Sequence, residues 1–293
     1  MKSRLALLLA GLVLLGVATT PPPAPELPVI ELHRTSKASH FDPARSSSPL
    51  FVLVIGSDVR EGDPSGGRAD SLHLVALDPN AGRGTIIGIP RDSYVPIPGL
   101  GSSKINAALA RGGPERMVQT VSQLAGVPIH YWAVTEFSRF RQLVDAVGGV
   151  DVDVPYAMAD PASGAFFDPG RRRMNGAEAL AFSRNRKTVP GGDFGRSLNQ
   201  GRVLLASLSQ FRRDARSPLK LASYLLAFNR FVETNVPTRE LLQLAAIARR
   251  VDPAKVENLV LPGGGGSAGG ASIVNLGSGA SEIFAAVRDD AVR

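Results

Sequence analysis

Apolar and polar positions along this chain of 293 residues change period from segment to segment. Residues 50–56 (LFVLVIG) are continuously apolar, which is typical of a strand buried on both faces. The same reading predicts further strands at 71–78, 84–89, 129–135, 150–154, 256–261 and 272–276. Helical periodicity and helix-start signals predict helices at 104–111, 114–125, 137–147, 177–184, 197–213, 219–232, 239–251 and 281–292. Strands alternating with helices favour an α/β fold with a central mixed β-sheet and helices on both faces.

Two segments depart from this alternation. The glycine-rich stretch at 263–270 is predicted to be a surface loop. At the N-terminus, Lys2 and Arg4 precede an apolar run at 5–18, which as a helix would cover about 21 Å. This is shorter than the hydrocarbon core of a bilayer, so the run fits either a signal peptide or a short, uncleaved membrane anchor.

The leading positive charges predict that the N-terminus stays inside and that the following chain lies outside the cytoplasm. We therefore predict a signal or membrane anchor at 1–20, a Pro/Ser-rich extracytoplasmic linker at 21–48 and a folded domain at 49–293. The expected location is the cell membrane with the domain extracytoplasmic, or secretion if the first segment is cleaved.

Composition limits the kinds of functional site that the chain can form. The chain is 44% hydrophobic, enough for a sizeable core, and has no cysteine, which excludes disulfides, thiolate metal sites and a cysteine nucleophile. Its four histidines have no ligand spacing, and His73 and His130 are expected in strands. The formal charge of +7 comes from arginine, which either serves phosphate recognition or reflects genomic base composition. Nucleic acid is not an expected partner, because export signals, one tryptophan and interspersed acids oppose it.

Long polar side chains gather between residues 184 and 200, on both sides of a glycine loop at 191–195. The glycines permit a tight turn that would return the following helix to the preceding arginines. The side chains suited to hydrogen-bonding phosphate oxygens are Arg184, Arg186, Lys187, Arg196 and Gln200. Taken singly, each basic residue could simply be solvated; as a set they predict an anion site.

Two aspartates lie where neighbouring strands end and begin. Asp58 follows the first buried strand and Asp70 precedes the second, so the two could meet at one edge of the sheet. Paired carboxylates beside phosphates usually hold Mg²⁺, although either alone could be a turn residue or a helix cap. Arg91 would add a bidentate clamp with Asp92 as its partner, and Lys104 would open a helix whose first N–H groups favour an anion.

The order of these motifs resembles the LytR-CpsA-Psr enzymes over residues 50–213. The motifs are VLVIGSD (52–58), GGRADSLHLVALD (66–78), IPRDSYVPIPG (89–99), KINAALARGGP (104–114), VDAVGGVDVDVP (144–155), MNGAEALAFSRNRK (174–187) and GGDFGRSLNQ (191–200). The resemblance implies that residues 49–293 are a phosphotransferase domain. Such an enzyme moves a glycopolymer from a polyprenyl diphosphate carrier onto a cell-wall acceptor, usually peptidoglycan.

The resemblance also implies roles by motif position. Asp58 and Asp70 resemble the Mg²⁺ ligands. The resemblance leaves the group that accepts the hydroxyl proton open, and Asp70 is the first candidate for it on chemical grounds. The diphosphate clamp would be Arg91, Arg184, Arg186 and Arg196, with Lys104 and Gln200 contributing and Arg68, Asp92 and Asp193 as secondary candidates. The alternative is a carrier that binds polyprenyl phosphates without catalysis.

A prenyl tail needs a long apolar channel. The candidate lining residues are Leu72, Leu74, Ile86, Val121, Leu124, Leu143, Val147, Leu204, Leu205 and Leu208, most of which could equally be core.

Overall fold

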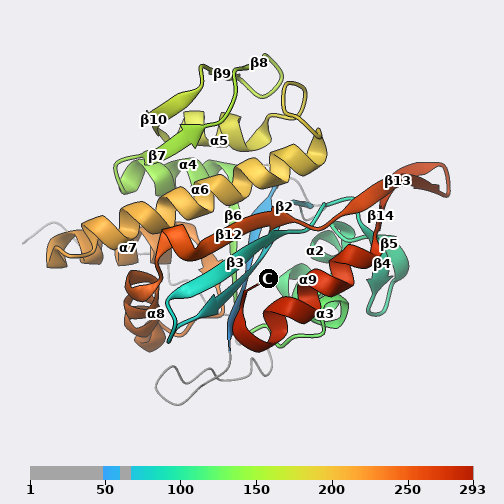
Figure 1. Cartoon of the computed structure of the whole chain (residues 1–293), viewed down its shortest axis with the longest axis horizontal. Coiled ribbons are helices and arrows are strands. Elements are labelled where there is room, and N and C mark those ends of the chain that lie inside the picture. Colours follow the sequence, from blue (N-terminus) through green and yellow to red (C-terminus); the bar gives the residue numbers. More distant parts are fainter. Residues whose placement is uncertain (1–48, 60–66, 293) are drawn as a thin grey trace, which may run out of the picture. The chain divides into compact units, whose positions relative to one another are not determined.

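The computed structural model describes residues 49–59 and 67–292. Its centre is a six-stranded mixed sheet (Figure 1) with the order β11-β6-β1-β2-β3-β12. The strands are β1 (Leu50–Ser57), β2 (Ala69–Asp78), β3 (Arg83–Gly88), β6 (Tyr131–Glu136), β11 (Glu233–Thr234) and β12 (Val256–Val260). β2 runs antiparallel to its two neighbours β1 and β3, whereas β6 runs parallel to β1 and β12 parallel to β3. The predicted α/β fold with a mixed central sheet is confirmed.

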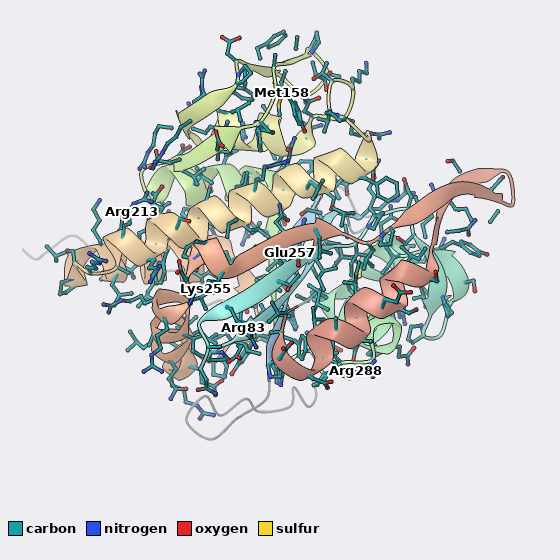
Figure 2. All side chains as sticks on the ribbon, in the orientation of Figure 1. Arg83, Met158, Arg213, Lys255, Glu257 and Arg288 are labelled. Atoms are coloured by element: carbon teal, nitrogen blue, oxygen red, sulfur yellow. The ribbon has the colours of Figure 1, made fainter. Side chains whose placement is uncertain are left out.

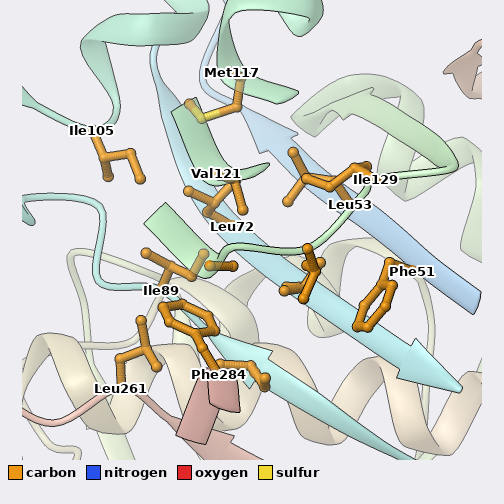
Figure 3. Close-up of a cluster of buried hydrophobic side chains, with 14 of the residues drawn as sticks. Phe51, Leu53, Leu72, Ile89, Ile105, Met117, Val121, Ile129, Leu261 and Phe284 are labelled. Atoms are coloured by element: carbon orange, nitrogen blue, oxygen red, sulfur yellow. The ribbon is translucent and has the colours of Figure 1, made fainter. Parts of the chain in front are cut away.

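Alternate residues of the strands enter two different hydrophobic clusters, one on each face of the sheet. The first face carries Leu53, Leu74 and Ile87, each 0% exposed. The helices that cover it are α2 (Ala107–Ala110), α3 (Gly113–Ala125) and α9 (Ser278–Asp290). Figure 3 shows Phe284 of α9 and Met117 and Val121 of α3 in the cluster that covers this face of the strands. This face is a closed core.

The second face carries Val52, Val75 and Ile86 and packs on α6 (Asp193–Asp214) and α8 (Thr238–Arg250). Although β1 and β2 are central strands, Val52, Val54 and Val75 are only half-buried. Half-buried valines in the middle of a covered sheet indicate that the helices do not seal this face completely.

The remaining elements build a layer on α6 and two hairpins. α4 (Phe137–Ala146) and α5 (Gly176–Arg184) pack with the antiparallel pair β7 (Val150–Val154) and β10 (Gly170–Met174) around Phe182. The hairpin β8 (Met158–Asp160) and β9 (Ala165–Phe167) lies beside them, and α7 (Pro218–Phe231) contacts α4 and α6. The 3₁₀ turn η1 (Pro253–Lys255) leads into β12.

Two predictions of local structure are wrong. Residues 104–111 are not one helix: Lys104 ends β5 (Gly101–Lys104), which pairs with β4 (Tyr94–Ile97). Gly99 and Gly101 have φ of 74° and 69° at this turn, a conformation that suits glycine and redirects the chain before the short α2. The 263–270 loop is instead mostly a strand, β13 (Gly263–Ala268), paired with β14 (Ala271–Leu276), because backbone pairing needs no side chains.

Of the ten candidate channel residues, four lie in the cluster of the first face and four in that of the second. Leu72, Leu74 and Val121 are at most 1% exposed and are core residues, as the alternative interpretation holds. Leu204, Leu205 and Leu208 lie on α6 toward the second face and are half-buried. A channel cannot touch both faces of one sheet, so only the second set can line it.

The predictions for residues 1–48 lie outside the described residues. Within 49–59 and 67–292, no helix is long and apolar enough to cross a membrane.

Candidate functional site

The site begins where β1 ends and β2 starts. Gly56 pairs with Ser71 and Ser57 pairs with Ala69, so Asp70 is the extra residue of a β-bulge. A bulge bends its strand and re-aims the side chain of the extra residue. Beyond it, the N–H of Asp58 donates to the carbonyl of Arg68 (3.1 Å), and the N–H of Arg68 donates to Asp58 Oδ1 (2.6 Å). The bulge therefore places Asp70 and Asp58 at one edge of the sheet, as the sequence predicts.

Arg91 lies in the turn after β3 and forms an ion pair with Asp70 through Nη1 and Oδ1. The β4–β5 hairpin returns Lys104 to the same turn, where its Nζ is 3.0 Å from Asp92 Oδ1. Lys104 thus reaches the site from the end of a strand, and not from a helix N-terminus as predicted. Asp92 is also 3.9 Å from Arg91 Nε, so it is shared by two cations.

α6 supplies the other half of the site. Gly191 and Gly192 have φ of 77° and 57°, which turns the chain directly into the first turn of α6. There Arg196 Nη2 lies 3.0 Å from Asp193 Oδ1, and Arg186 Nε lies 3.6 Å from the same oxygen. The predicted return of Arg196 to the preceding arginines is confirmed, although its helix begins one turn earlier than expected.

The charged residues around Arg91 and those of the first turn of α6 shift each other's pKa values. Burial by itself lowers the pKa of Arg91, but the carboxylate of Asp70 raises it and the net shift is upward. Asp193 and Asp92 add to that rise. The pKa of Arg196 is lowered on balance: burial lowers it most, the carboxylates of Asp193 and Asp70 oppose the shift, and repulsion from Arg91 and Arg186 adds to it.

Arg196 is 5% exposed, and its Nε has no hydrogen-bond partner among the described residues. A buried, repelled guanidinium with an unused donor is stabilised by an anion.

The other predicted residues lie around this cluster. Gln200 Nε2 donates to the carbonyls of Ser183 (3.2 Å) and Asp70 (3.4 Å), and so links α5, α6 and β2. Arg184 is the last residue of α5, with its guanidinium 5.2 Å from the centre of the Phe137 ring. Arg68 is exposed and contacts Asp58 through its backbone. Arg184 and Arg68 therefore border the cluster and do not belong to the ion pairs that define it.

His73 is a residue of this region that sequence reasoning did not use. It lies on β2, fully buried, with Nε2 3.1 Å from the carbonyl of Ser197 and Nδ1 3.2 Å from Ser71 Oγ. Burial lowers its pKa to about 4, so the ring is neutral at pH 7. It joins β2 to the first turns of α6 and thereby supports Arg196. The period-2 pattern of β2 could have placed it on the second face.

Two carboxylates of the site are candidates for holding a magnesium ion. No group of three or more His, Cys, Asp or Glu side chains able to hold a metal occurs in the described part of the chain. Asp58 and Asp70 offer two carboxylates at one sheet edge. This fits Mg²⁺, which usually takes one or two carboxylates and completes its shell with phosphate oxygens and water.

The fold and this cluster of arginines and aspartates define a class of protein. The LytR_cpsA_psr family matches residues 30–284, so the chain belongs to this family. It is 38% identical over 202 residues to the polyisoprenyl-teichoic acid–peptidoglycan teichoic acid transferase TagU of Bacillus mycoides, covering 68% of this chain and 64% of that protein. The chain thus spans just under two thirds of that relative.

Solved structures share the fold. TagV of Bacillus subtilis superposes with a TM-score of 0.71 at 30% identity, covering 82% of this chain and 95% of that one. The family protein YwtF (TagT) with bound octaprenyl pyrophosphate lipid superposes with a TM-score of 0.64 at 24% identity, over 85% and 91%. The latter likeness supports the fold alone.

Proposed function

We propose that this protein is an extracytoplasmic phosphotransferase. It would move a glycopolymer from a polyprenyl diphosphate carrier onto a cell-wall acceptor such as peptidoglycan. The observation that carries the proposal is the cluster in which Arg91, Arg186 and Arg196 meet Asp70 and Asp193 at the edge of the sheet. The naming of TagU as a teichoic acid transferase supports the same reaction class.

The cluster suits a diphosphate because its ion pairs contain more cations than carboxylates and are formed before substrate arrives, while the further carboxylate, that of Asp58, would be offset by Mg²⁺. Arg91, Arg186, Arg196 and Lys104 face three carboxylates, those of Asp70, Asp92 and Asp193. Phosphoryl transfer depends mostly on positioning and on neutralising the charge of the phosphoryl and leaving groups. A buried guanidinium such as Arg196 does this more strongly than a solvated one, because less water screens it.

In the proposed reaction, the acceptor hydroxyl oxygen attacks the sugar-linked phosphorus in line with the diphosphate bridge. The bond from this phosphorus to the bridging oxygen breaks, and polyprenyl phosphate leaves with that oxygen. Asp70 takes the hydroxyl proton. Mg²⁺, held by Asp58 and Asp70, would supply further charge neutralisation at the phosphate oxygens. Arg184, Arg68 and Gln200, at the border, would hold the outer parts of the substrate.

The prenyl tail is proposed to lie against the second face of the sheet. The support is the incomplete burial of Val52, Val54 and Val75, together with Leu204 and Leu208 of α6 on the facing side. Val54 is the register partner of His73, which contacts the first turns of α6. A tail on this face would therefore begin beside the arginine cluster.

The proposed location is the membrane, with residues 1–20 as anchor or signal, 21–48 as linker and the catalytic domain outside the cytoplasm. Its partners would be the lipid-linked glycopolymer, the wall acceptor and the bilayer.

The test uses the full chain, purified from a bacterial membrane and extracted for mass spectrometry. We expect a co-purified polyprenyl phosphate or diphosphate. Addition of a diphosphate-linked glycolipid with Mg²⁺ should then release polyprenyl phosphate, and EDTA should stop this. Bound lipid without Mg²⁺-dependent turnover would replace the transferase with a carrier. Absence of both lipid and turnover would reject the proposal.

The matched variants are Asp58→Asn and Asp252→Asn. Asp252 pairs with Arg212 (3.1 Å) at the start of η1 and is a comparable half-exposed carboxylate away from the cluster. Only Asp58→Asn should raise the Mg²⁺ concentration needed for turnover.

A further inference from the structure

α7 is a largely apolar helix whose inner side packs on the domain and whose outer side is left uncovered by the rest of the described structure. Of its 14 residues, only Ala227 is buried. The helix nevertheless contains four leucines and two phenylalanines: Leu219, Leu221, Leu225, Leu226, Phe228 and Phe231. Leu221, Leu225, Phe228 and Phe231 are half-buried against the domain, whereas Leu219 and Leu226 are exposed to solvent. This composition indicates that α7 has a further partner.

The outward side of α7 is defined by its two most exposed leucines. Leu219 is 84% exposed and Leu226 is 71% exposed, the highest values among the large hydrophobic residues of the described chain. They are seven positions apart and so lie on one side of the helix, two turns from each other. Ala222, also exposed, lies between them. Together these residues form the α7 outer face.

The opposite side of α7 fixes the orientation of this face. The hydroxyl of Tyr224 donates to Asp214 Oδ2 at 2.9 Å, and its ring packs edge-on against Phe211 with centroids 5.2 Å apart. Both partners belong to α6. Because α7 is held by this inner contact, the outer face points away from the domain.

The surroundings of the α7 outer face are basic. Residues 215–232 contain Arg216, Lys220 and Arg230 and no acidic residue. At the end of α6, Arg213 lies 3.2 Å from Asp151, a carboxylate that it shares with Arg171 and Arg173 of β10. Figure 2 labels Arg213 at the end of α6 that leads into α7. This group lies toward the inner side of α7, because Arg173 also bonds Gln210, which bonds the hydroxyl of Tyr224, so the cations next to the outer face are Arg216, Lys220 and Arg230.

We propose that the α7 outer face docks onto the surface of an anionic phospholipid bilayer. Exposed leucines flanked by cations are the composition of interfacial helices, which place their apolar side among the acyl chains and their cations at the headgroups. A second copy of the chain is disfavoured as occupant, because symmetric pairing would juxtapose the same cations. The docking itself is argued from α7 alone. Its use to the protein rests on the proposed function: docking would hold the catalytic domain where a lipid-linked donor is present.

The test places a fluorophore on α7 in the full-length protein. Since the chain has no cysteine, Ala222→Cys creates a single labelling site for nitrobenzoxadiazole. The matched control is Ala159→Cys, an exposed alanine that follows Met158 on β8; Figure 2 labels Met158. Each protein is reconstituted in phosphatidylcholine vesicles with or without phosphatidylglycerol, and nitroxide-labelled lipids serve as quenchers.

We expect the label at position 222 to be quenched at least about two-fold more than the label at 159, and more strongly with phosphatidylglycerol present. Leu219→Ser with Leu226→Ser should remove the difference. Equal quenching at the two positions would overturn the proposal. So would a dimer in detergent, seen by light scattering, that the same two substitutions dissociate. The protein could also fail to turn over glycolipid while the label at position 222 is still quenched. That result would reject the proposed function but not the docking surface.

Discussion

Arg196 combines burial, two repelling neighbours and an unused Nε donor, which is why the proposed chemistry assigns it the central role. We expect Arg196→Lys to lower kcat/KM about 100-fold, because one point charge replaces a planar set of donors. Arg186→Lys should cost about 10-fold or less, since that side chain is 53% exposed and water screens it. Turnover of the diphosphate lipid measures both effects, and urea unfolding checks that both variants fold. If Arg196→Lys turned over the lipid at the wild-type rate, Arg196 would not have the central role in catalysis that is proposed for it.

His73 makes the stability of the domain depend on pH. The folded protein keeps this ring neutral down to about pH 4, whereas the unfolded chain protonates it near pH 6.5. The unfolded state therefore binds more protons between these values, and stability falls as the pH falls through them. The contribution of His73 is about 3 kcal/mol across the window.

Urea unfolding at pH 7 and pH 5 tests this expectation. His73→Gln keeps hydrogen-bonding capacity but cannot gain the charge, so its unfolding free energy should change less with pH than that of the wild type. Equal pH slopes for the two proteins would contradict it.

At the scale of elements, the glycines that lead into and form the first turn of α6 determine where Arg196 lies. A Cβ added at Gly195 would lie 2.1 Å from the carbonyl oxygen of Pro190, too close for real atoms. Gly195→Ala should therefore displace the first turn of α6, lower the unfolding free energy by about 1–3 kcal/mol and also reduce turnover. Gly264→Ala in β13 is the control, because a Cβ there meets no described atom within 4 Å. Equal stability of the two variants would show that the turn tolerates a side chain.

The elements also show what sequence patterns can predict. The apolar run of β1 and the helical period of α3 follow directly from which residues are buried. The bounds of both elements were therefore predicted within one or two residues. The hairpins β4–β5 and β8–β9 were missed because their strands have only three or four residues, too few to show a period. The bulge at Asp70 was also missed, since it depends on the register of two strands and not on either strand alone.

In the functional site too, motif order predicted which residues come together but not the contacts that they make. Motif order predicted that Arg91, Arg196 and Asp70 belong together, and the structure brings them together. It could not predict that Arg186 and Arg196 share Asp193, or that Lys104 arrives from a strand. Those contacts are set by how separate elements pack.

At the scale of the whole domain, the two faces of the sheet differ in how completely they are covered. Leu53 on the first face is 0% exposed, whereas its neighbour Val54 on the second face is half-buried. If the second face holds a prenyl tail, a larger side chain at position 54 should compete with the tail and leave the fold intact. We therefore compare Val54→Trp with Leu53→Trp, which places the same bulk one residue earlier on the opposite face.

Leu53→Trp should lower the unfolding free energy by about 1–3 kcal/mol or more through overpacking, and should affect all donors alike. Val54→Trp should cost less stability and raise KM for a long-chain prenyl diphosphate donor several-fold more than for a short-chain donor, because only a long tail needs the occupied space. Urea unfolding and steady-state kinetics with donors of two chain lengths give both readouts. If Val54→Trp destabilised the domain as much as Leu53→Trp and did not distinguish the donors, position 54 would be ordinary core and the tail would have to lie elsewhere.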